Sequence, residues 1–101
     1  EIVLPAVGEG CLPVWHVFVV LVENRDAVAE ALSRQGVSTG LHYPVPLHLQ
    51  KAYARMGLSE GAFPVAEACA ERLLSLPMFP ELTAEQIRYV CDNLKTAVRS
   101  S

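Results

Sequence analysis

The stretch Val14-Trp15-His16-Val17-Phe18-Val19-Val20-Leu21-Val22 is the longest apolar run in the sequence, and only His16 interrupts it. In an extended strand, successive side chains point to opposite faces, and both faces of this run are apolar. Strands with two apolar faces are typical of central positions in a sheet. The run is also far below the roughly 20 residues that span a bilayer. We therefore expect a central strand over 14–22, with His16 as its one polar side chain, and no membrane crossing.

The residues around this run predict a helix and two further strands. A helix is expected over about 25–35, where Gly36 can end it in a left-handed conformation. The segment 37–43 contains β-branched residues and stops at Pro44, which favours an extended strand. A short apolar run over 2–7 adds an entry strand. The first half of the chain is thus expected to supply a small sheet of about three strands.

The second half of the chain predicts helices. Helices over 47–56 and 64–74 are each expected to begin beside a proline, which suits the first helical turn. The run Thr83-Ala84-Glu85-Gln86 is a capping box, and apolar residues recur at helical spacing from there to about residue 99. The segment 75–80 holds two prolines, so it can form a short edge strand or a linker but no helix. We expect one α/β domain over 1–101, a two-layer α+β sandwich in which helices cover the sheet.

Composition and charge narrow the classes of partner. The chain has 101 residues, of which 51% are hydrophobic, enough for one domain with its own core. The net charge of -3 provides no basic surface, so nucleic acid is not an expected partner. Cys11, Cys69 and Cys91 form no CxxC pair, which fits a reduced cytoplasm rather than a disulfide framework. The chain opens on Glu1 without an initiator Met or a signal peptide, so we expect a piece of a longer protein.

The densest polar cluster is Gly40-Leu41-His42-Tyr43-Pro44-Val45-Pro46-Leu47-His48-Leu49-Gln50. Two histidines, a tyrosine and a glutamine meet there, where a strand end leads into a rigid turn and a helix start. The prolines would hold the backbone in place before a ligand arrives, as a binding loop requires. An ordinary polar turn with surface histidines is the competing interpretation.

The histidines allow two further interpretations. His42 and His48 are conceivable metal ligands, but their spacing matches no zinc pattern and no third ligand is close in sequence. His16 is either a hydrogen-bonded core histidine or a ligand contact, on a strand that could run beside the strand of His42.

Other polar residues offer less chemistry. Lys51 and Lys95 lie on predicted helices among solvent-facing neighbours, where a reactive amine is not expected. Glu67 and Glu71 form an i, i+4 pair typical of a solvated helix face. Ser75 has no G-x-S-x-G setting for nucleophilic catalysis. These residues therefore offer no motif for catalysis.

A series of short motifs extends from about Pro13 to Leu94. In order, they are Val14-Trp15-His16-Val17-Phe18, Arg25-Asp26, Gly36-Val37 leading into Gly40-Leu41-His42-Tyr43-Pro44, Leu47-His48-Leu49-Gln50, Phe63-Pro64-Val65-Ala66-Glu67, Leu74-Ser75-Leu76-Pro77-Met78-Phe79-Pro80 and Leu82-Thr83. In this order and at these spacings, the set resembles the C-terminal region of the DegT/DnrJ/StrS family of nucleotide-sugar aminotransferases.

The resemblance implies a fold-type-I aminotransferase. Its large domain carries the Schiff-base lysine and is followed by a small α/β domain like this one, in a homodimer with active sites near the subunit interface. Such enzymes move an amino group, commonly from glutamate, onto a keto group of a nucleotide-linked sugar, as in polysaccharide or antibiotic sugar biosynthesis. Pyridoxal phosphate (PLP) supplies the carbanion chemistry. The lysine-bearing segment has no counterpart here, so we expect no PLP on this chain alone and no activity from it.

The resemblance also implies roles for individual residues. His42 and Tyr43 match family positions that face the sugar end of the active site, as does His48 at the following helix start. His16 matches a recurrent histidine of the preceding strand. These four residues are expected to bind substrate rather than to catalyse. Two alternatives stay open: a sugar dehydratase of the same family, and a non-catalytic interaction or dimerisation module.

Overall fold

The computed structural model describes residues 1–101. In chain order, its elements are β1 (Ile2–Val3), β2 (Phe18–Val22), α1 (Arg25–Arg34), the 3-10 helices η1 (Leu47–Leu49) and η2 (Lys51–Met56), α2 (Pro64–Arg72), β3 (Leu73–Leu76) and α3 (Ala84–Ser100). The expected mixture of a small sheet and helices is confirmed.

The sheet is antiparallel, with strand order β1-β2-β3. The central position expected for the long apolar run is therefore confirmed, but β2 begins at Phe18 and not at Val14. The physical reason lies in its partner. Phe18 pairs with Leu76, the last residue of β3, and Pro77 follows, which has no N–H to continue the ladder.

The strand expected over 37–43 is wrong. This segment touches the sheet at one residue only, through an isolated bridge between Gly40 and Ser75. Pro44 and Pro46 then turn the chain away, because neither can donate to a ladder. The third strand is instead β3, which lies at the sheet edge. The edge-strand alternative for 75–80 is thus confirmed in part, but the strand begins at Leu73, where the sequence predicts the end of a helix, and stops before Pro77.

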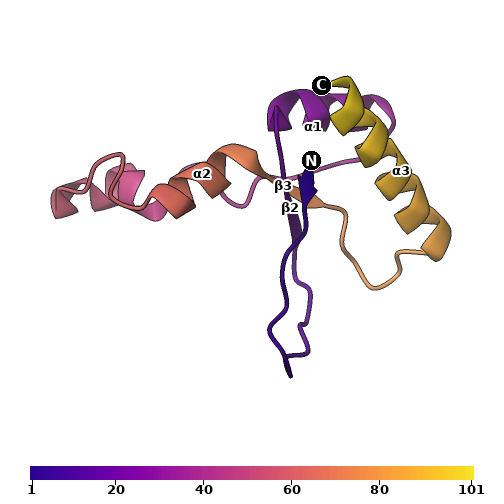
Figure 1. Cartoon of the computed structure of the whole chain (residues 1–101), viewed down its shortest axis with the longest axis horizontal. Coiled ribbons are helices and arrows are strands. Elements are labelled where there is room, and N and C mark those ends of the chain that lie inside the picture. Colours follow the sequence, from indigo (N-terminus) through magenta and orange to yellow (C-terminus); the bar gives the residue numbers. More distant parts are fainter.

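One face of the sheet is covered by α1 and α3, as Figure 1 shows. Val20, Val22 and Leu74 from the strands pack there against Leu32 of α1 and Leu94 of α3, and the first four side chains are fully buried. The predicted capping box is confirmed, since Thr83 and its partner three residues later exchange both hydrogen bonds. This face holds the hydrophobic core.

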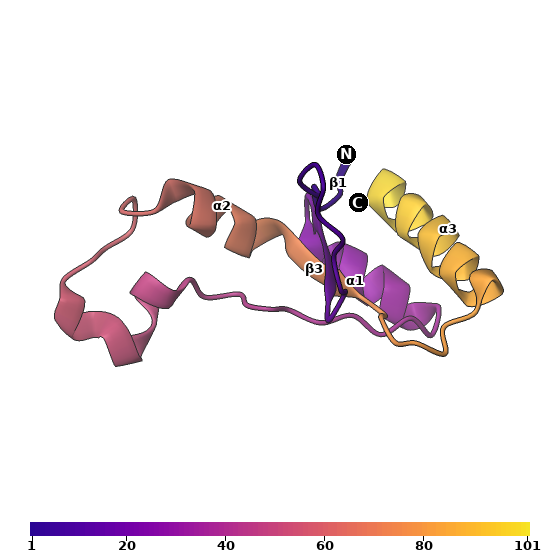
Figure 2. The ribbon, with the colours of Figure 1, turned by 90° about the horizontal axis from the view of Figure 1, so that it is seen from below.

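Residues 47–72, here called the arm, comprise η1, η2 and α2 and extend away from the sheet (Figure 1, Figure 2). Every residue from 51 to 66 is exposed. The radius of gyration is 15.4 Å, against about 13 Å for a compact chain of this length. The accessible surface is 7379 Å², against about 5,600 Å² for a compact monomer of this mass. The arm and the exposed connection between β1 and β2, which also projects from the sheet in Figure 1, together account for this open shape.

None of the helices is both long and apolar enough to cross a bilayer.

Candidate functional site

The polar turn lies where the sheet meets the arm. Gly40 anchors it to β3 through two backbone hydrogen bonds: the Gly40 N–H donates to the Ser75 carbonyl at 3.0 Å, and the Ser75 N–H donates to the Gly40 carbonyl at 2.8 Å. Beyond it, Pro46 directly precedes η1. The turn is therefore held at one end by the sheet and at the other by the arm.

His42 contacts β3 through its side chain. Its Nδ1 atom lies 2.8 Å from the Oγ atom of Ser75, a residue that is only 4% exposed. The ring covers Gly40, since a Cβ atom at that position would come within 2.8 Å of the His42 Cε1 atom. Only glycine leaves room for the ring there. His42 is itself exposed, and its Nε2 atom makes no hydrogen bond within the chain.

Tyr43 lies beside this ring and is open to solvent. The two ring centroids are 5.4 Å apart with an interplanar angle of 85°, which is an edge-to-face contact. Tyr43 is 70% exposed, and its hydroxyl has no partner within the chain. The turn thus offers an imidazole N and a phenol to a ligand.

His48 is placed differently, because it is buried inside the arm. Its ring packs edge-to-face on Phe63 at a centroid distance of 4.9 Å, and its Nε2 atom lies 3.5 Å from the Oε2 atom of Glu67. At that distance the Nε2 atom has no hydrogen-bond partner. His48 therefore joins η1 to α2 and forms part of the wall of a cavity.

That cavity has a volume of about 540 Å³ and lies between the 3-10 helices and α2. This is within the size range of small-molecule sites, roughly 300–1,000 Å³. Ten of its twelve lining residues are hydrophobic, a count that includes Tyr43, and the other two are Pro46 and His48. The hydroxyl of Tyr43 and the ring of His48 supply polar groups to this lining. Two of the four predicted site residues, Tyr43 and His48, thus line one cavity, and His42 contacts Tyr43.

His16 does not lie on the central strand, so that expectation is corrected. It is exposed in a bend two residues before β2. The strand does not extend back to His16 because Phe18 already pairs with the last residue of β3, which Pro77 follows. No hydrogen bond or ring contact joins it to the three residues of the turn. His16 lies in the connection between β1 and β2, which Figure 1 shows projecting beyond the sheet.

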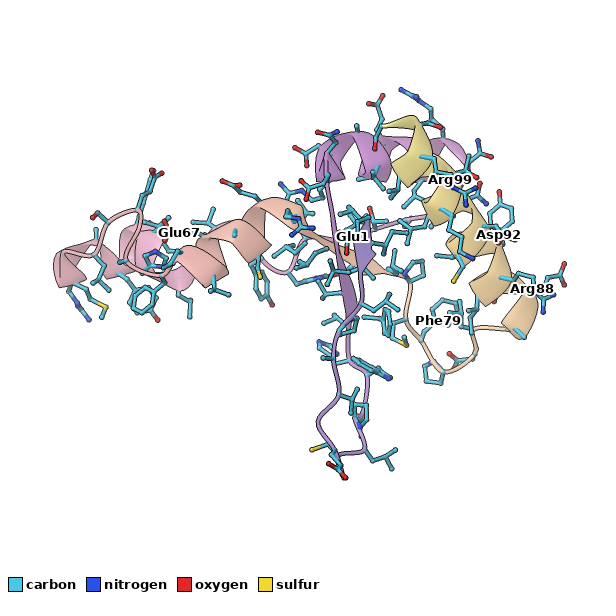
Figure 3. All side chains as sticks on the ribbon, in the orientation of Figure 1. Glu1, Glu67, Phe79, Arg88, Asp92 and Arg99 are labelled. Carbon is cyan, nitrogen blue, oxygen red and sulfur yellow. The ribbon has the colours of Figure 1, made fainter.

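Sequence reasoning missed Glu67. Its carboxylate accepts hydrogen bonds from the backbone N–H groups of Gly61, at 2.8 and 3.1 Å, and Phe63, at 3.1 Å. It is a clamp on the start of α2 and not a solvated side chain. Figure 3 labels Glu67 on the arm, on the opposite side of the sheet from Phe79.

Sequence reasoning also missed Ser75. The available signal was its position as the single polar residue of the strand Leu73-Leu74-Ser75-Leu76, since a buried hydroxyl needs a partner.

The lysines decide whether this chain could hold PLP. PLP enzymes bind the cofactor through a lysine and place a charged partner beside the ring nitrogen. Lys51 and Lys95 are both exposed, and the cavity of the arm is lined by no lysine and no carboxylate. The residues of this chain therefore do not fit a PLP site by themselves. No group of three or more histidine, cysteine or acidic side chains lies close enough together to hold a metal ion.

Known proteins match this chain closely. A family model described as the DegT/DnrJ/EryC1/StrS aminotransferase family matches residues 5–95. The erythromycin biosynthesis sensory transduction protein EryC1 of Saccharopolyspora erythraea is 46% identical over 94 residues, covering 93% of this chain and 26% of that protein. The dTDP-3-amino-3,4,6-trideoxy-alpha-D-glucose transaminase of Streptomyces venezuelae is 43% identical over 92 residues, covering 91% of this chain and 24% of that protein.

The fold matches as well. The crystal structure of S. venezuelae DesV in complex with a ketimine intermediate aligns with a TM-score of 0.86 at 41% identity, covering 95% of this chain and 26% of that chain. The chain thus spans about a quarter of the length of these relatives. The family model covers far more than half of the chain. The chain belongs to the DegT/DnrJ/EryC1/StrS aminotransferase family.

Proposed function

We propose that this chain is the small C-terminal domain of a PLP-dependent aminotransferase that acts on a nucleotide-linked keto sugar. Three observations support this: the family match, the coverage of about a quarter of each relative, and the name of the S. venezuelae relative, a transaminase of a dTDP-linked amino sugar. A larger domain of the same protein would hold PLP and its lysine. The whole enzyme would be a cytoplasmic homodimer that takes its amino group from a donor such as glutamate.

The observation that carries the proposal is the pair of free polar groups on the turn. The Nε2 atom of His42 and the hydroxyl of Tyr43 have no partners in the chain, although the ring of His42 is fixed by Ser75. A group that is fixed but unpaired, as the His42 Nε2 atom is, suits a preorganised site, because little order is lost when the ligand binds. In this proposal they bind oxygen atoms of the sugar or of the diphosphate.

The other two histidines have lesser roles in the proposal. His48 is buried, so it would shape the wall of the cavity and reach a ligand only at the surface that it shares with Tyr43. His16 is exposed on the projecting connection between β1 and β2 and would contact the substrate from there. Neither is assigned a catalytic step.

A second candidate function is a non-catalytic interaction module. It is supported by one observation, the name of the S. erythraea relative, which is a sensory transduction protein. The exposed surface of the arm would serve such a module as well as it would serve an enzyme domain.

The full-length protein that carries this chain separates the two candidates. Purified with PLP, an aminotransferase should show the visible absorbance of bound cofactor and transfer an amino group from glutamate to a dTDP-linked keto sugar. The His42→Gln variant should keep that absorbance while its KM for the sugar rises. A protein that contains a lysine-bearing large domain and yet stays colourless with PLP would favour the interaction module.

A further inference from the structure

The Ser75 hydroxyl has one hydrogen-bond partner in the chain, the Nδ1 atom of His42 at 2.8 Å. Ser75 is 4% exposed, with β2 on one side and Gly40 on the other, and its backbone groups are already paired with Gly40. A hydroxyl carries one proton to donate, and a buried donor without an acceptor is costly. Nδ1 is the acceptor within reach, so the Ser75 hydroxyl donates to it.

The direction of this hydrogen bond determines which ring nitrogen of His42 carries the proton. A neutral histidine ring carries one N–H, so a ring that accepts at Nδ1 carries its proton on Nε2. We infer that Ser75 is a positioning residue that holds His42 in the Nε2–H tautomer, so that the ring presents a donor, and not an acceptor, to the ligand. The matching ligand atom is an oxygen that accepts, such as a phosphate or keto oxygen.

Gly40 supplies a second and independent constraint on the same ring. A Cβ atom at Gly40 would lie 2.8 Å from Cε1 and 3.4 Å from Nδ1 of His42. Contacts below 3.0 Å force a shift, so a side chain at residue 40 would push the ring away from Ser75. Two backbone hydrogen bonds join Gly40 to Ser75. The glycine under the His42 ring and the serine that bonds to the ring are therefore held together.

The tautomer of His42 stands on this geometry alone, whereas its action on a nucleotide sugar rests on the proposed function. A keto sugar carries oxygens that accept hydrogen bonds at its reacting end, and the diphosphate of a nucleotide sugar carries further accepting oxygens. A ring held as a donor discriminates in favour of such oxygens and against groups that can only donate, because two donors cannot pair. Ser75 would in this way act on substrate choice without touching the substrate.

The test uses the full-length protein that carries this chain, with histidine rings labelled with 15N. Long-range 1H–15N correlations distinguish an Nε2–H ring from an Nδ1–H ring, and the His42→Gln variant assigns the His42 signals. The wild type should show the Nε2–H pattern. Ser75→Ala should give a mixture of tautomers, and Ser75→Thr, which keeps the hydroxyl, should retain the pattern. Ser33→Ala, an exposed serine on α1, is the matched control and should change nothing.

An Nδ1–H pattern in the wild type overturns the inference, and so does an Nε2–H pattern that survives Ser75→Ala. The wild-type result depends on no variant at the buried Ser75, because only the exposed His42 is replaced for the assignment. Gly40→Ala provides a second disturbance of the same ring and should also mix the tautomers while leaving the Ser75 hydroxyl in place.

Addition of dTDP-glucose and UDP-N-acetylglucosamine separates the inference from the proposed function. If the nucleotide sugars shift the His42 signals, and if these shifts are weaker in Ser75→Ala, both the positioning role of Ser75 and the proposed function are supported. An Nε2–H ring that depends on Ser75 but ignores both nucleotide sugars upholds the positioning role and contradicts the proposed function. In turnover, Ser75→Ala should raise KM for the keto sugar about 3- to 10-fold, the size expected for one misaligned neutral hydrogen bond, with a smaller change in kcat.

Discussion

The Oε2 atom of Glu67 lies 3.5 Å from the Nε2 atom of the buried His48, and the same carboxylate accepts backbone hydrogen bonds from Gly61 and Phe63. His48 in turn packs on the ring of Phe63. One carboxylate and two rings therefore connect η1, the loop before α2 and α2 itself. Since the arm has few other buried contacts, these residues should decide whether it keeps its shape.

Replacing Glu67 with alanine should loosen the start of α2. The change removes hydrogen bonds to a charged group at the first turn of a helix, where a carboxylate also favours the helix dipole. We expect a loss of about 1–2 kcal/mol in the stability of the arm, discounted for its partial exposure. Hydrogen exchange at the amides of Gly61 and Phe63 should accelerate.

Glu71→Ala is the matched control, because Glu71 lies one turn along the same helix, is exposed and makes no hydrogen bond. Its exchange rates should match those of the wild type at both amides. Equal acceleration in the two variants would show that charge on α2, and not the clamp, controls the loop.

His42 and His48 should respond differently to the same substitution. His48→Ala removes a buried ring that packs on Phe63, so it should lower the stability by about 2 kcal/mol. His42 is exposed, so water can take its place at Ser75, and His42→Ala should cost less than about 1 kcal/mol. In the full-length enzyme, the larger rise of KM for the nucleotide sugar should belong to His42→Ala.

Thermal unfolding and steady-state kinetics of the two variants, measured side by side, check this. If His48→Ala raised KM without lowering the melting temperature, His48 would be a substrate contact rather than part of the cavity wall.

Features that depend on neighbours in sequence were predictable. The capping box at Thr83 and the left-handed Gly36 that follows a helix act within a few residues, and both appear in the structure. The central position of β2 was also predictable, since a strand that is apolar on both faces fits best between neighbours.

Features that depend on partners far along the chain were not predictable. Nothing in the sequence shows that β3 begins directly after α2, or that Ser75 pairs with Gly40 and reaches His42, 33 residues away. The false strand over 37–43 has the same origin. Its β-branched residues satisfied the local preference for a strand, but only tertiary pairing decides which segment joins the sheet.

The apolar run itself offers a test of where the strand begins. Val14 and Val20 belong to the same run, yet Val14 is 95% exposed and Val20 is fully buried. Val20→Ala should therefore lower the free energy of unfolding by about 2 kcal/mol through lost burial and a cavity. Val14→Ala should stay within about 0.5 kcal/mol of the wild type. Urea denaturation of both variants measures the difference, and similar losses would place Val14 in a buried strand.

The open shape predicts self-association of the isolated chain. Its accessible surface of 7379 Å² exceeds that of a compact monomer by an area similar to a protein interface, and Leu47 and Met56 expose large apolar side chains on the arm. Exposed apolar side chains that lie together on a surface favour association. Sedimentation velocity should show the average mass rising with concentration, and Leu47→Glu combined with Met56→Glu should suppress the rise. Thr96→Glu, exposed on α3, should not suppress it. A chain that stays monomeric at high concentration would mean that the arm folds back over its own cavity in solution.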